Sequence, residues 1–598
     1  MFGGRPVMRG MRVLTVVVAL SHAPPGLGAV MTTAHRTAGV APLAVFFDTV
    51  NDSTTSAPTF AWASGVTQPS DMEGSNWSWD FGDSTAGTWA QTGKSRNTAT
   101  GYTAAHVYET PGTYTVTLTV TDPAGTASDR YTQTITVSAF KGSTFYAAAG
   151  ARGNGLSPST PGSLSAGVAY LNAGSGRRLL IRRGDTFNLG TSQYIISGAG
   201  PGIIDAYADG TAGHTANDPV PVLTSNRTAT GAVIQIQAND WRVMNLDMRG
   251  PNATSFGASA VCYNPGLPIA DMLVMRLKAS GGWFVAFGSD DPYGSTVGTP
   301  EDRIFYVEVE SSGSYSMEGY LGARRLALLG NYFHDTQASH NFRSYQAHKA
   351  VLSNNKFSAP GISNRHTLKL HSEATGLGYA ESRWISITDN IFSAGPYSSW
   401  NVSIGPENAQ SDERVSHVIY ERNHNIGGPA TSLDLEGSSA YTIVRNNIFE
   451  AGTRADDYCG VSYTRRGVEP VPENIRIFNN TFYKTTKNLN GSTVNGVRID
   501  PQAINAHVRN NLVVMTGGGG TATAVSGGGG KGWTASNNLL VTNPATSVFT
   551  DRSGGHFTLS GNSPAIGAGM MLPEVHEDFM RAARSAGTRC DLGAYKSR

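Results

Sequence analysis

Cysteine is scarce in this chain of 598 residues. The three cysteines, Cys262, Cys459 and Cys590, lie far apart, and none belongs to a CxxC pair or has a Cys/His spacing. The sequence therefore indicates neither a zinc site nor a framework of disulfides, and one disulfide is the most that it allows.

Charged residues are scarce as well. Asp, Glu, Lys and Arg make up 15% of the chain, the formal net charge is +1, and no long basic run occurs. Proteins that bind a nucleic-acid backbone carry a basic patch or stripe, so we expect no nucleic acid as a partner. With 39% hydrophobic residues the chain is not a disordered polyelectrolyte either.

Long apolar runs are absent beyond the N-terminus, where the pattern is that of a secretory signal peptide. Arg9 and Arg12 precede an apolar run at residues 13–20, and small residues follow at 26–29. We predict that residues 1–30 are a signal peptide and that the protein is secreted. No later run approaches the roughly 20 apolar residues that a membrane span needs, so we expect none.

Glycine, by contrast, is abundant at 71 residues, and an Asn-x-apolar signature recurs in the second half of the chain. Each copy follows a short alternating apolar run, and the longest interval equals about two coils of a stacked solenoid. In such coils a buried Asn at a bend bonds its amide to the same Asn one coil above and below. We interpret seven asparagines as structural for this reason: Asn331, Asn355, Asn390, Asn447, Asn480, Asn511 and Asn538.

The segment 38–139 alternates strand-like runs with turns. It contains Trp77-Ser-Trp-Asp-Phe-Gly-Asp83 and later a Pro-Gly-x-Tyr-x-Val run from Pro111, whose apolar residues share one face by period two. These motifs closely resemble the PKD domain. The resemblance implies an immunoglobulin-like β-sandwich of the kind found beside catalytic domains in secreted polysaccharide- and protein-degrading enzymes. We expect Asp80 and Asp83 to bond turn amides rather than to catalyse, and the module to be a spacer or a substrate-adhesion unit.

Residues 141–598 resemble a second known type of protein. A first strand, a glycine-rich loop at 153–161, a capping helix at about 163–173 and an Arg-Gly-Asp-Thr-Phe strand at 183–187 look like the start of right-handed parallel β-helix proteins. Residues 563–569 and 589–595 look like their closing segment. The predicted fold class is therefore all-β, a sandwich followed by a right-handed parallel β-helix. This scaffold carries lyases, glycosidases, epimerases, esterases and phage tailspikes, so the fold alone does not set the function.

Six short runs align by their inward apolar residues, beginning at residues 342, 368, 402, 433, 461 and 497. If they are consecutive coils of one sheet, their outward side chains form two parallel rows. The first row reads Arg343, Lys369, Ser403, Asp434, Ser462 and Arg498, and the second reads Tyr345, His371, Gly405, Glu436, Thr464 and Asp500.

The basic end of these rows predicts a lyase site for an acidic polysaccharide. In β-elimination from a uronic acid, a cation neutralises the carboxylate, a base takes the C5 proton and an acid protonates the leaving oxygen. We assign Arg343 to the carboxylate, Lys369 or His371 to the base, and Tyr345 or the remaining group to the acid. Six further residues complete the predicted site as substrate contacts: Glu318, Glu373, Asp434, Glu436, Arg498 and Asp500. The alternative is an outer face of structural ion pairs.

The acidic part of the rows supports a second hypothesis. Asp434 and Glu436 are two residues apart on one strand, hence about 7 Å apart, and Asp500 lies two coils away, at about 10 Å. Inverting glycosidases hold two carboxylates roughly 6.5–9.5 Å apart, so a glycoside hydrolase is the alternative enzyme. Ordinary solvated acids would have the same pattern.

The sequence is also compatible with a protein that cleaves no glycosidic bond. A non-catalytic adhesin or tailspike-like carbohydrate-binding protein would use the β-helix as a stalk, and an epimerase is a minor option. We expect no obligatory cofactor, although loop acids at 290–291 and 301–302 could bind calcium. Trp400 could stack on a sugar ring or pack in the core. We expect a polysaccharide as the partner and a monomeric protein.

Overall fold

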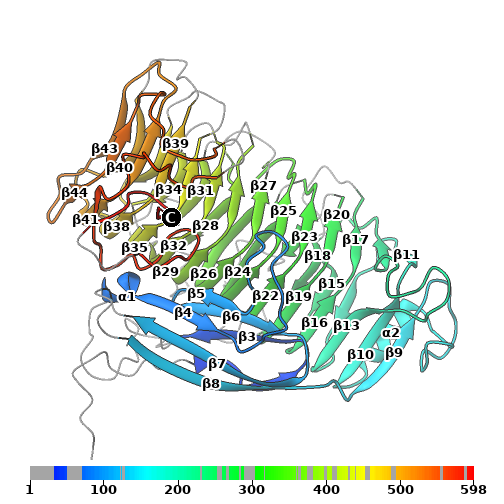
Figure 1. Cartoon of the computed structure of the whole chain (residues 1–598). Helices are drawn as coiled ribbons and strands as arrows, with labels where there is room; N and C mark the ends of the chain where they lie inside the picture. Colours follow the sequence, from blue (N-terminus) through cyan, green and yellow to red (C-terminus); the bar gives the residue numbers. More distant parts are fainter. Residues whose placement is uncertain are drawn as a thin grey trace, which may run out of the picture.

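The structure is a computed structural model of the chain (Figure 1). It describes residues 33–49, 70–121, 123, 128–228, 232–251, 259–263, 269–281, 284–287, 303–315, 317–358, 360, 365–372, 381–395, 400–406, 414–428, 431–437, 439–451, 458–485, 493–552, 556–584 and 589–597. The predicted signal peptide at 1–30 lies outside these residues.

The N-terminal segment forms a β-sandwich. One sheet has the order β1-β3-β6 and the other the order β2-β8-β7-β4-β5. Trp77 and Trp79 fill the space between the sheets, and Val116, Leu118 and Val120 alternate inward as predicted. The elements are β1 (Thr33–Ala34), β2 (Ala38–Val40), β3 (Leu43–Asp48), α1 (Ser70–Gly74), β4 (Asn76–Asp80), β5 (Thr98–Thr100), β6 (Thr103–Tyr108), β7 (Gly112–Thr121) and β8 (Ser128–Ser138).

The two acids of the sandwich motif bond to turns, as predicted. Asp80 Oδ1 accepts a hydrogen bond from the Gly82 amide at 2.8 Å. Asp83 accepts from the Thr85 amide at 3.3 Å and contacts His106 Nε2 at 3.1 Å. These carboxylates fix the bend after β4, where Gly82 has a φ of 69°.

The rest of the chain winds into a solenoid with three parallel sheets, here named A, B and C, and most strands pair with the equivalent strand one coil away. The rise per coil is about 4.8 Å. Two long strands, β24 (Gly319–Leu329) and β26 (Phe342–Ser353), run through both sheet A and sheet B. The helix α2 (Leu164–Asn172) covers the first coil, with Ser163 as its N-cap, where the sequence predicts a capping helix (Figure 1).

Sheet A contains, besides β24 and β26, the strands β12 (Tyr194–Ile196), β15 (Ala232–Ile236), β18 (Ser259–Tyr263), β21 (Phe284–Phe287), β28 (Leu368–Ser372), β31 (Trp400–Pro406), β34 (Thr431–Glu436), β37 (Cys459–Thr464), β40 (Val494–Ile499) and β43 (Ala522–Gly527). Sheet B contains β9 (Ser143–Ala147), β10 (Arg177–Arg182), β13 (Gly202–Tyr207), β16 (Trp241–Met244), β19 (Met272–Met275), β22 (Arg303–Val307), β29 (Glu381–Thr388), β32 (Arg414–Glu421), β35 (Ser439–Arg445), β38 (Glu473–Phe478), β41 (Ile504–Arg509) and β44 (Thr534–Ser536).

Sheet C has 13 short strands: β11 (Thr186–Asn188), β14 (Val222–Thr224), β17 (Asp247–Arg249), β20 (Lys278–Ser280), β23 (Glu310–Ser312), β25 (Tyr332–His334), β27 (Lys356–Ser358), β30 (Ile391–Ser393), β33 (His424–Ile426), β36 (Ile448–Glu450), β39 (Thr481–Lys484), β42 (Leu512–Met515) and β45 (Leu539–Val541). Two short strands, β46 (Gly569–Met570) and β47 (Arg589–Cys590), pair in the C-terminal segment.

The predicted asparagine ladder lies at the bend between sheets B and C. All seven predicted asparagines belong to it, and each donates its amide to the next, for example Asn447 Nδ2 to Asn480 Oδ1 at 2.9 Å. An eighth member, Asn423, fills the double interval between Asn390 and Asn447. The residue before each ladder position has a positive φ, as at Asn446 (56°), a conformation that Asn tolerates better than most residues.

The coil that contains Asn423 does not match the Asn-x-apolar signature, because the third residue of the motif, which points into the core, is polar in this coil. Asn425 takes the place of the phenylalanines in this column, and its Oδ1 accepts from the hydroxyl of Tyr420 at 2.7 Å. The Tyr420 ring stacks between Phe392 and Phe449, at centroid distances of 6.2 and 6.4 Å. The tyrosine thus satisfies the buried amide and continues the aromatic column.

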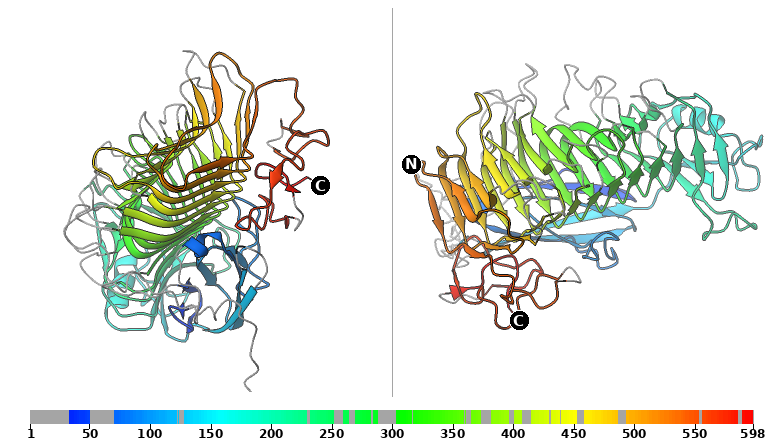
Figure 2. Two further views of the ribbon diagram at one scale, coloured as in Figure 1. Left: turned by 90° about the vertical axis from the view of Figure 1, so that its left-hand side faces the viewer. Right: turned by 90° about the horizontal axis from the view of Figure 1, so that it is seen from above.

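The sandwich packs along the outer face of sheet B (Figure 2). Apolar side chains of this face, among them Trp384, Ile419, Ile443 and Phe478, form one core with the sandwich. The C-terminal segment, through Leu572 and Val575, contributes to the same core. The sandwich thus shares a hydrophobic core with the solenoid and the C-terminal segment.

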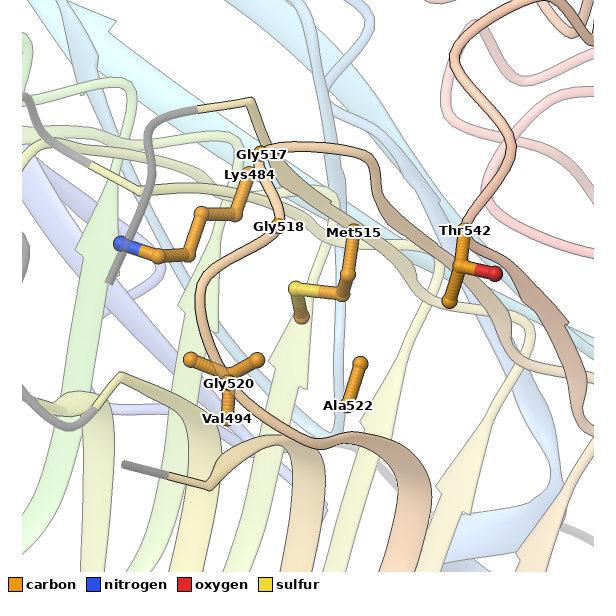
Figure 3. A pocket seen from close by; sticks show the side chains of 8 residues that line it. All are labelled: Lys484, Val494, Met515, Gly517, Gly518, Gly520, Ala522 and Thr542. Atoms are coloured by element: carbon orange, nitrogen blue, oxygen red, sulfur yellow. The ribbon is translucent and has the colours of Figure 1, made fainter. Parts of the chain in front are cut away.

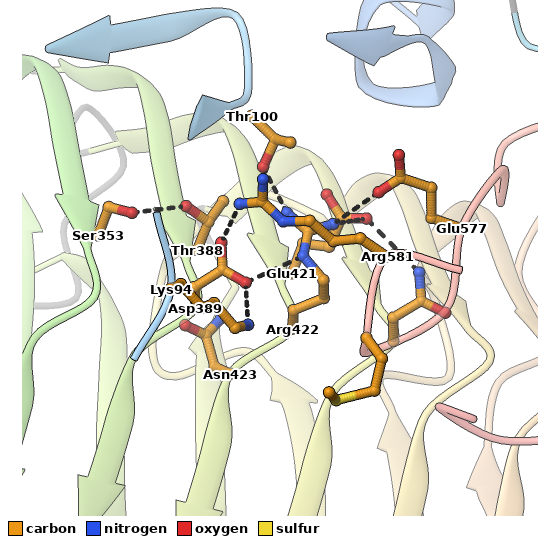
Figure 4. A network of polar contacts seen from close by, with 12 residues as sticks. Lys94, Thr100, Ser353, Thr388, Asp389, Glu421, Arg422, Asn423, Glu577 and Arg581 are labelled. Carbon is orange, nitrogen blue, oxygen red and sulfur yellow. Dashed lines mark hydrogen bonds and ion pairs between the residues drawn. The ribbon is translucent and has the colours of Figure 1, made fainter. Parts of the chain in front are cut away.

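A buried network of charges ties these three parts together (Figure 4). Asp389, at the end of β29, bonds Lys94 of the sandwich at 2.5 Å, Arg422 of the solenoid at 3.0 Å and Arg581 of the C-terminal segment at 2.9 Å. Its carboxylate has no exposed surface, and the nearby cations outweigh the effect of burial and hold the pKa of Asp389 well below its usual value.

Among the residues that the structure describes, no helix has the length and apolarity to cross a membrane. Cys459 and Cys590 are buried free thiols, and the side chain of Cys262 lies outside the described part of the chain.

Candidate active site

The first predicted row exists on the outer face of sheet A. Strand pairing places Arg343 beside Lys369, Lys369 beside Ser403, and so on through Asp434 and Ser462 to Arg498. The register follows from the two apolar residues that flank each row position, such as Leu368 and Leu370, which point into the core. In the second row, His371 pairs with Gly405 and Glu436 with Thr464.

The basic end of the row is built around a contact between Arg343 and His371. Arg343 Nε donates a hydrogen bond to His371 Nε2 at 2.7 Å. The guanidinium also lies 5.2 Å from the ring centroid of Tyr320, its partner on β24 one coil earlier. The arginine is thus held from the side by the imidazole and from below by the phenol ring.

His371 is neutral in this arrangement. It is fully buried, and burial together with Arg343 and Lys369 holds the pKa of His371 well below its usual value. A neutral imidazole that accepts at Nε2 carries its proton on Nδ1. Since Arg343 and Lys369 are half-buried, the two cations are the part of this group that solvent reaches.

The middle of the row is acidic. Asp434 and Glu436 are 4% and 2% exposed, and Ser403 Oγ donates to Glu436 Oε1 at 3.2 Å. Burial and the neighbouring Glu436 raise the pKa of Asp434 to about 7. Burial also raises the pKa of Glu436, against the opposing effects of Arg466 and Lys369. Asp434 can therefore carry a proton near neutral pH.

Arg466, in the loop after β37, bridges these two acids. Its Nη2 lies 3.2 Å from Asp434 Oδ2, and its Nη1 lies 3.4 Å from Glu436 Oε1. The guanidinium also stands 4.3 Å from the ring centroid of Trp400. Sequence reasoning missed this residue because it lies outside the alternating strands; the adjacent pair Arg465-Arg466 directly after a row strand was its only signal.

Trp400 belongs to a stack of rings beside the row. Its ring lies parallel to that of His366 at 5.1 Å, and His366 stacks on His340 at 4.7 Å. His366 and Arg466 both contact the Trp400 ring, which is half-buried. Burial lowers the pKa of His366 to about 3, so this stack adds no positive charge.

The far end of the row holds Arg498, half-buried, and Asp500. Asp500 Oδ2 accepts from Arg465 Nε at 3.3 Å, and its Oδ1 accepts from the Gln502 amide at 2.8 Å. The Asp500 carboxylate thus bonds a turn and an arginine, which agrees with a structural function as well as with a predicted substrate contact.

The structure places Glu318 away from the outer face. The residue is 0% exposed; its carboxylate accepts from Ser311 Oγ at 2.5 Å and from the Ser314 amide at 3.0 Å. Burial raises the pKa of Glu318 to about 8. Glu318 closes the turn before β24 from inside, and we do not retain it as a substrate contact.

Two predicted site residues and the calcium hypothesis fall outside what the structure describes. These are the side chain of Tyr345, the whole of Glu373, and the loop acids at 290–291 and 301–302. Within the described residues, no group of three or more His, Cys, Asp and Glu side chains is arranged to hold a metal ion.

A cavity of about 250 Å³ lies near the C-terminal end of the solenoid, at the turn from sheet C to sheet A (Figure 3). Its wall includes Lys484, Met515 and the glycine-rich loop at 517–520. No residue of the two rows lines it, so it is separate from the candidate site.

Comparison with known proteins identifies the first module. Residues 40–137 match the PKD domain. No curated protein sequence matches the chain.

Several solved structures are similar to this chain at low identity. Pectate lyase Pel9A is 14% identical, with 76% of this chain and 96% of that chain covered and a TM-score of 0.35. The A-module of mannuronan C-5 epimerase AlgE6 of Azotobacter vinelandii is 12% identical (63% and 94% covered, TM-score 0.38). A family 28 exopolygalacturonase of Yersinia enterocolitica is 8% identical (87% and 99% covered, TM-score 0.27). At these values the likeness transfers no activity and no residue role. Residues 40–137 thus form a PKD domain, and the chain that follows forms a right-handed parallel β-helix.

Proposed function

We propose that this protein is a secreted lyase that cleaves a uronate-containing polysaccharide by β-elimination. The observation that carries the proposal is the cationic pair Arg343 and Lys369 on adjacent coils, with Arg343 bonded to a neutral, buried His371. Two half-buried cations on a row that runs along the solenoid suit a long acidic polymer.

The reaction needs three groups. Arg343 pairs with the uronate carboxylate and stabilises the negative charge that develops when the C5 proton leaves. We assign Lys369 as the base that takes that proton. The electron pair forms the C4=C5 double bond, the bond from C4 to the glycosidic oxygen breaks, and the leaving oxygen takes a proton from an acid or from water.

The structure bears on the choice of base that the sequence leaves open. The Nε2 lone pair of His371 accepts the hydrogen bond from Arg343, and the residue has no exposed surface. Its imidazole is therefore poorly suited to reach a sugar, and we propose His371 as a positioning residue for Arg343. Lys369 is half-buried and is the better candidate for the base.

In the test, the protein is incubated with pectate, alginate or glycosaminoglycans, and the ultraviolet absorbance of the conjugated double bond that β-elimination forms is followed. We expect Lys369→Ala to abolish it, with binding of the polymer retained. Lys278→Ala is the matched control, because this lysine is half-exposed on β20 and pairs with Glu310 at 3.1 Å far from the row. Full activity of Lys369→Ala would overturn the assignment.

A specific observation favours an inverting glycoside hydrolase as the second candidate. Asp434 and Glu436 are buried, lie on one strand face and have raised pKa values, as general acids of glycosidases do. New reducing ends without the ultraviolet chromophore, lost in Asp434→Asn, would establish it. A polymer that binds with no product of either kind would favour the adhesin.

A further inference from the structure

We propose that Arg466 determines the preference of the row for acidic polysaccharides, because it neutralises the two carboxylates in the middle of the row. The inference rests on the proposed function to the extent that the polymer lies along the row. It concerns binding, however, and not the bond that is cleaved.

The first argument is the order of the groups from the surface inward. The side chain of Arg466 is 43% exposed, whereas those of Asp434 and Glu436 are 5% and 3% exposed. Both acids lie within 3.4 Å of the guanidinium. A polymer over this part of the row therefore meets the arginine before it meets the carboxylates.

The second argument is that Arg466 is fixed in place. Glu469, which is 3% exposed, accepts from the backbone amide of Arg466 at 2.8 Å and from that of Gly437 at 2.9 Å. The Trp400 ring supports the guanidinium at 4.3 Å. Backbone, ring and acids together hold the charge in one position, so little entropy is lost when a ligand binds.

The third argument is the sign of charge along the row. Lys369 and Arg343 lie two and three coils from Asp434 on one side, and Arg498 lies two coils away on the other. A polyuronate that spans these cations must cross the acids between them. At pH 8, where Asp434 is ionised, uncompensated carboxylates there would repel it, while a neutral glycan would be affected far less.

The test measures binding without turnover. Dissociation constants are determined by calorimetry for an oligogalacturonate, an oligoguluronate and a neutral cello-oligosaccharide. For Arg466→Gln we expect the affinity for at least one acidic oligomer to fall at least about tenfold, and that for the neutral one to change less than about threefold. The triple variant Arg466→Gln/Asp434→Asn/Glu436→Gln should recover the acidic affinity to within about threefold of wild type.

Two further variants complete the design. Arg249→Gln is the matched control, because Arg249 is 55% exposed and pairs with Asp247 at 2.7 Å on sheet C; we expect no change. Arg466→Lys keeps the charge and should keep the acidic preference even if the triple variant does not fold. Equal losses for acidic and neutral oligomers, no recovery in a folded triple variant, or no acidic affinity in wild type would each overturn the inference. If the lyase product is absent while these binding results hold, only the proposed function fails.

Discussion

Replacement of Asn447 by Ala tests whether the asparagine ladder holds the coils together. Asn447 Oδ1 accepts from the backbone amide of Asn423 at 2.8 Å and from its Nδ2 at 3.2 Å. Its Nδ2 donates to Tyr420 O and to Asn480 Oδ1, both at 2.9 Å. All these groups are buried, so no water replaces the lost partner.

The expected cost follows from the groups left without partners. The alanine variant leaves the Asn423 amide unpaired, removes one bond from the Asn423 side chain and removes one of the bonds to the Tyr420 carbonyl, which stays within the pairing of β32 with β35. At about 1–3 kcal/mol for the unsatisfied amide and about 1 kcal/mol for each of the two other lost bonds, the loss is roughly 3–5 kcal/mol. Asn447→Asp should cost at least as much despite its equal size, because it lacks the Nδ2 donor and places a carboxylate against Asn480 Oδ1.

Asn538 provides the control. It is the last member of the ladder among the described residues, it is only half-buried, and it donates to Val508 O at 2.8 Å. Its Oδ1 accepts from the Asn511 amide at 3.1 Å, and because Asn538 is half-buried, water can take the place of its side chain. Asn538→Ala should therefore cost only about 1 kcal/mol. Urea unfolding followed by tryptophan fluorescence gives the two midpoints. Equal midpoints for Asn447→Ala and Asn538→Ala would refute the ladder as a source of stability.

Three further results are expected. Arg343→Lys keeps the charge but loses the Nε contact to His371, and should lower kcat/KM in the absorbance assay by about 10–100-fold, with the unfolding midpoint unchanged. Asp434→Asn should stabilise the protein by about 2 kcal/mol more at pH 8 than at pH 5. The pKa of Asp434 is about 7 in the folded protein and lower in the unfolded chain, so the wild-type protein loses stability as the pH rises through 7, whereas the asparagine variant does not. Equal shifts of the urea midpoint at the two pH values would contradict this. Asp389→Asn leaves Lys94 and two arginines around a neutral amide, which should lower the free energy of unfolding by about 3–5 kcal/mol. We expect a lower urea midpoint and earlier proteolysis of the PKD domain. An unchanged midpoint would show that the network does not stabilise the contact between the modules.

Much of the solenoid can be predicted from the sequence because the determinants are local and repeated. Each row strand carries two inward apolar residues around one outward residue, as in Leu368-Lys369-Leu370, and this pattern allows only one register. Asn423 escaped prediction because Asn425 replaces the expected apolar residue, and only the ring of Tyr420, close by along the chain, makes that exchange tolerable.

Contacts between distant segments could not be predicted in this way. Arg466 reaches the row from a loop, and nothing in its local sequence specifies that it bridges Asp434 and Glu436. Similarly, the outward apolar residues of sheet B, such as Ile419, resemble any half-buried strand residue until the sandwich is seen to cover them. Glu318 is a different case, because its partners Ser311 and Ser314 lie on the strand and turn directly before it, outside the aligned row strands.

The shared core of the PKD domain and sheet B has a practical consequence for anyone who wishes to cut the chain into parts. Trp384, Ile443 and Phe478 would face water in a truncated β-helix, and Asp389 would lose Lys94. Gene fragments that begin after residue 139 should therefore give insoluble material. If this PKD domain were fused to another enzyme, the apolar face that it buries against sheet B would be exposed to solvent and would promote aggregation. The two modules are best treated as a single unit of expression.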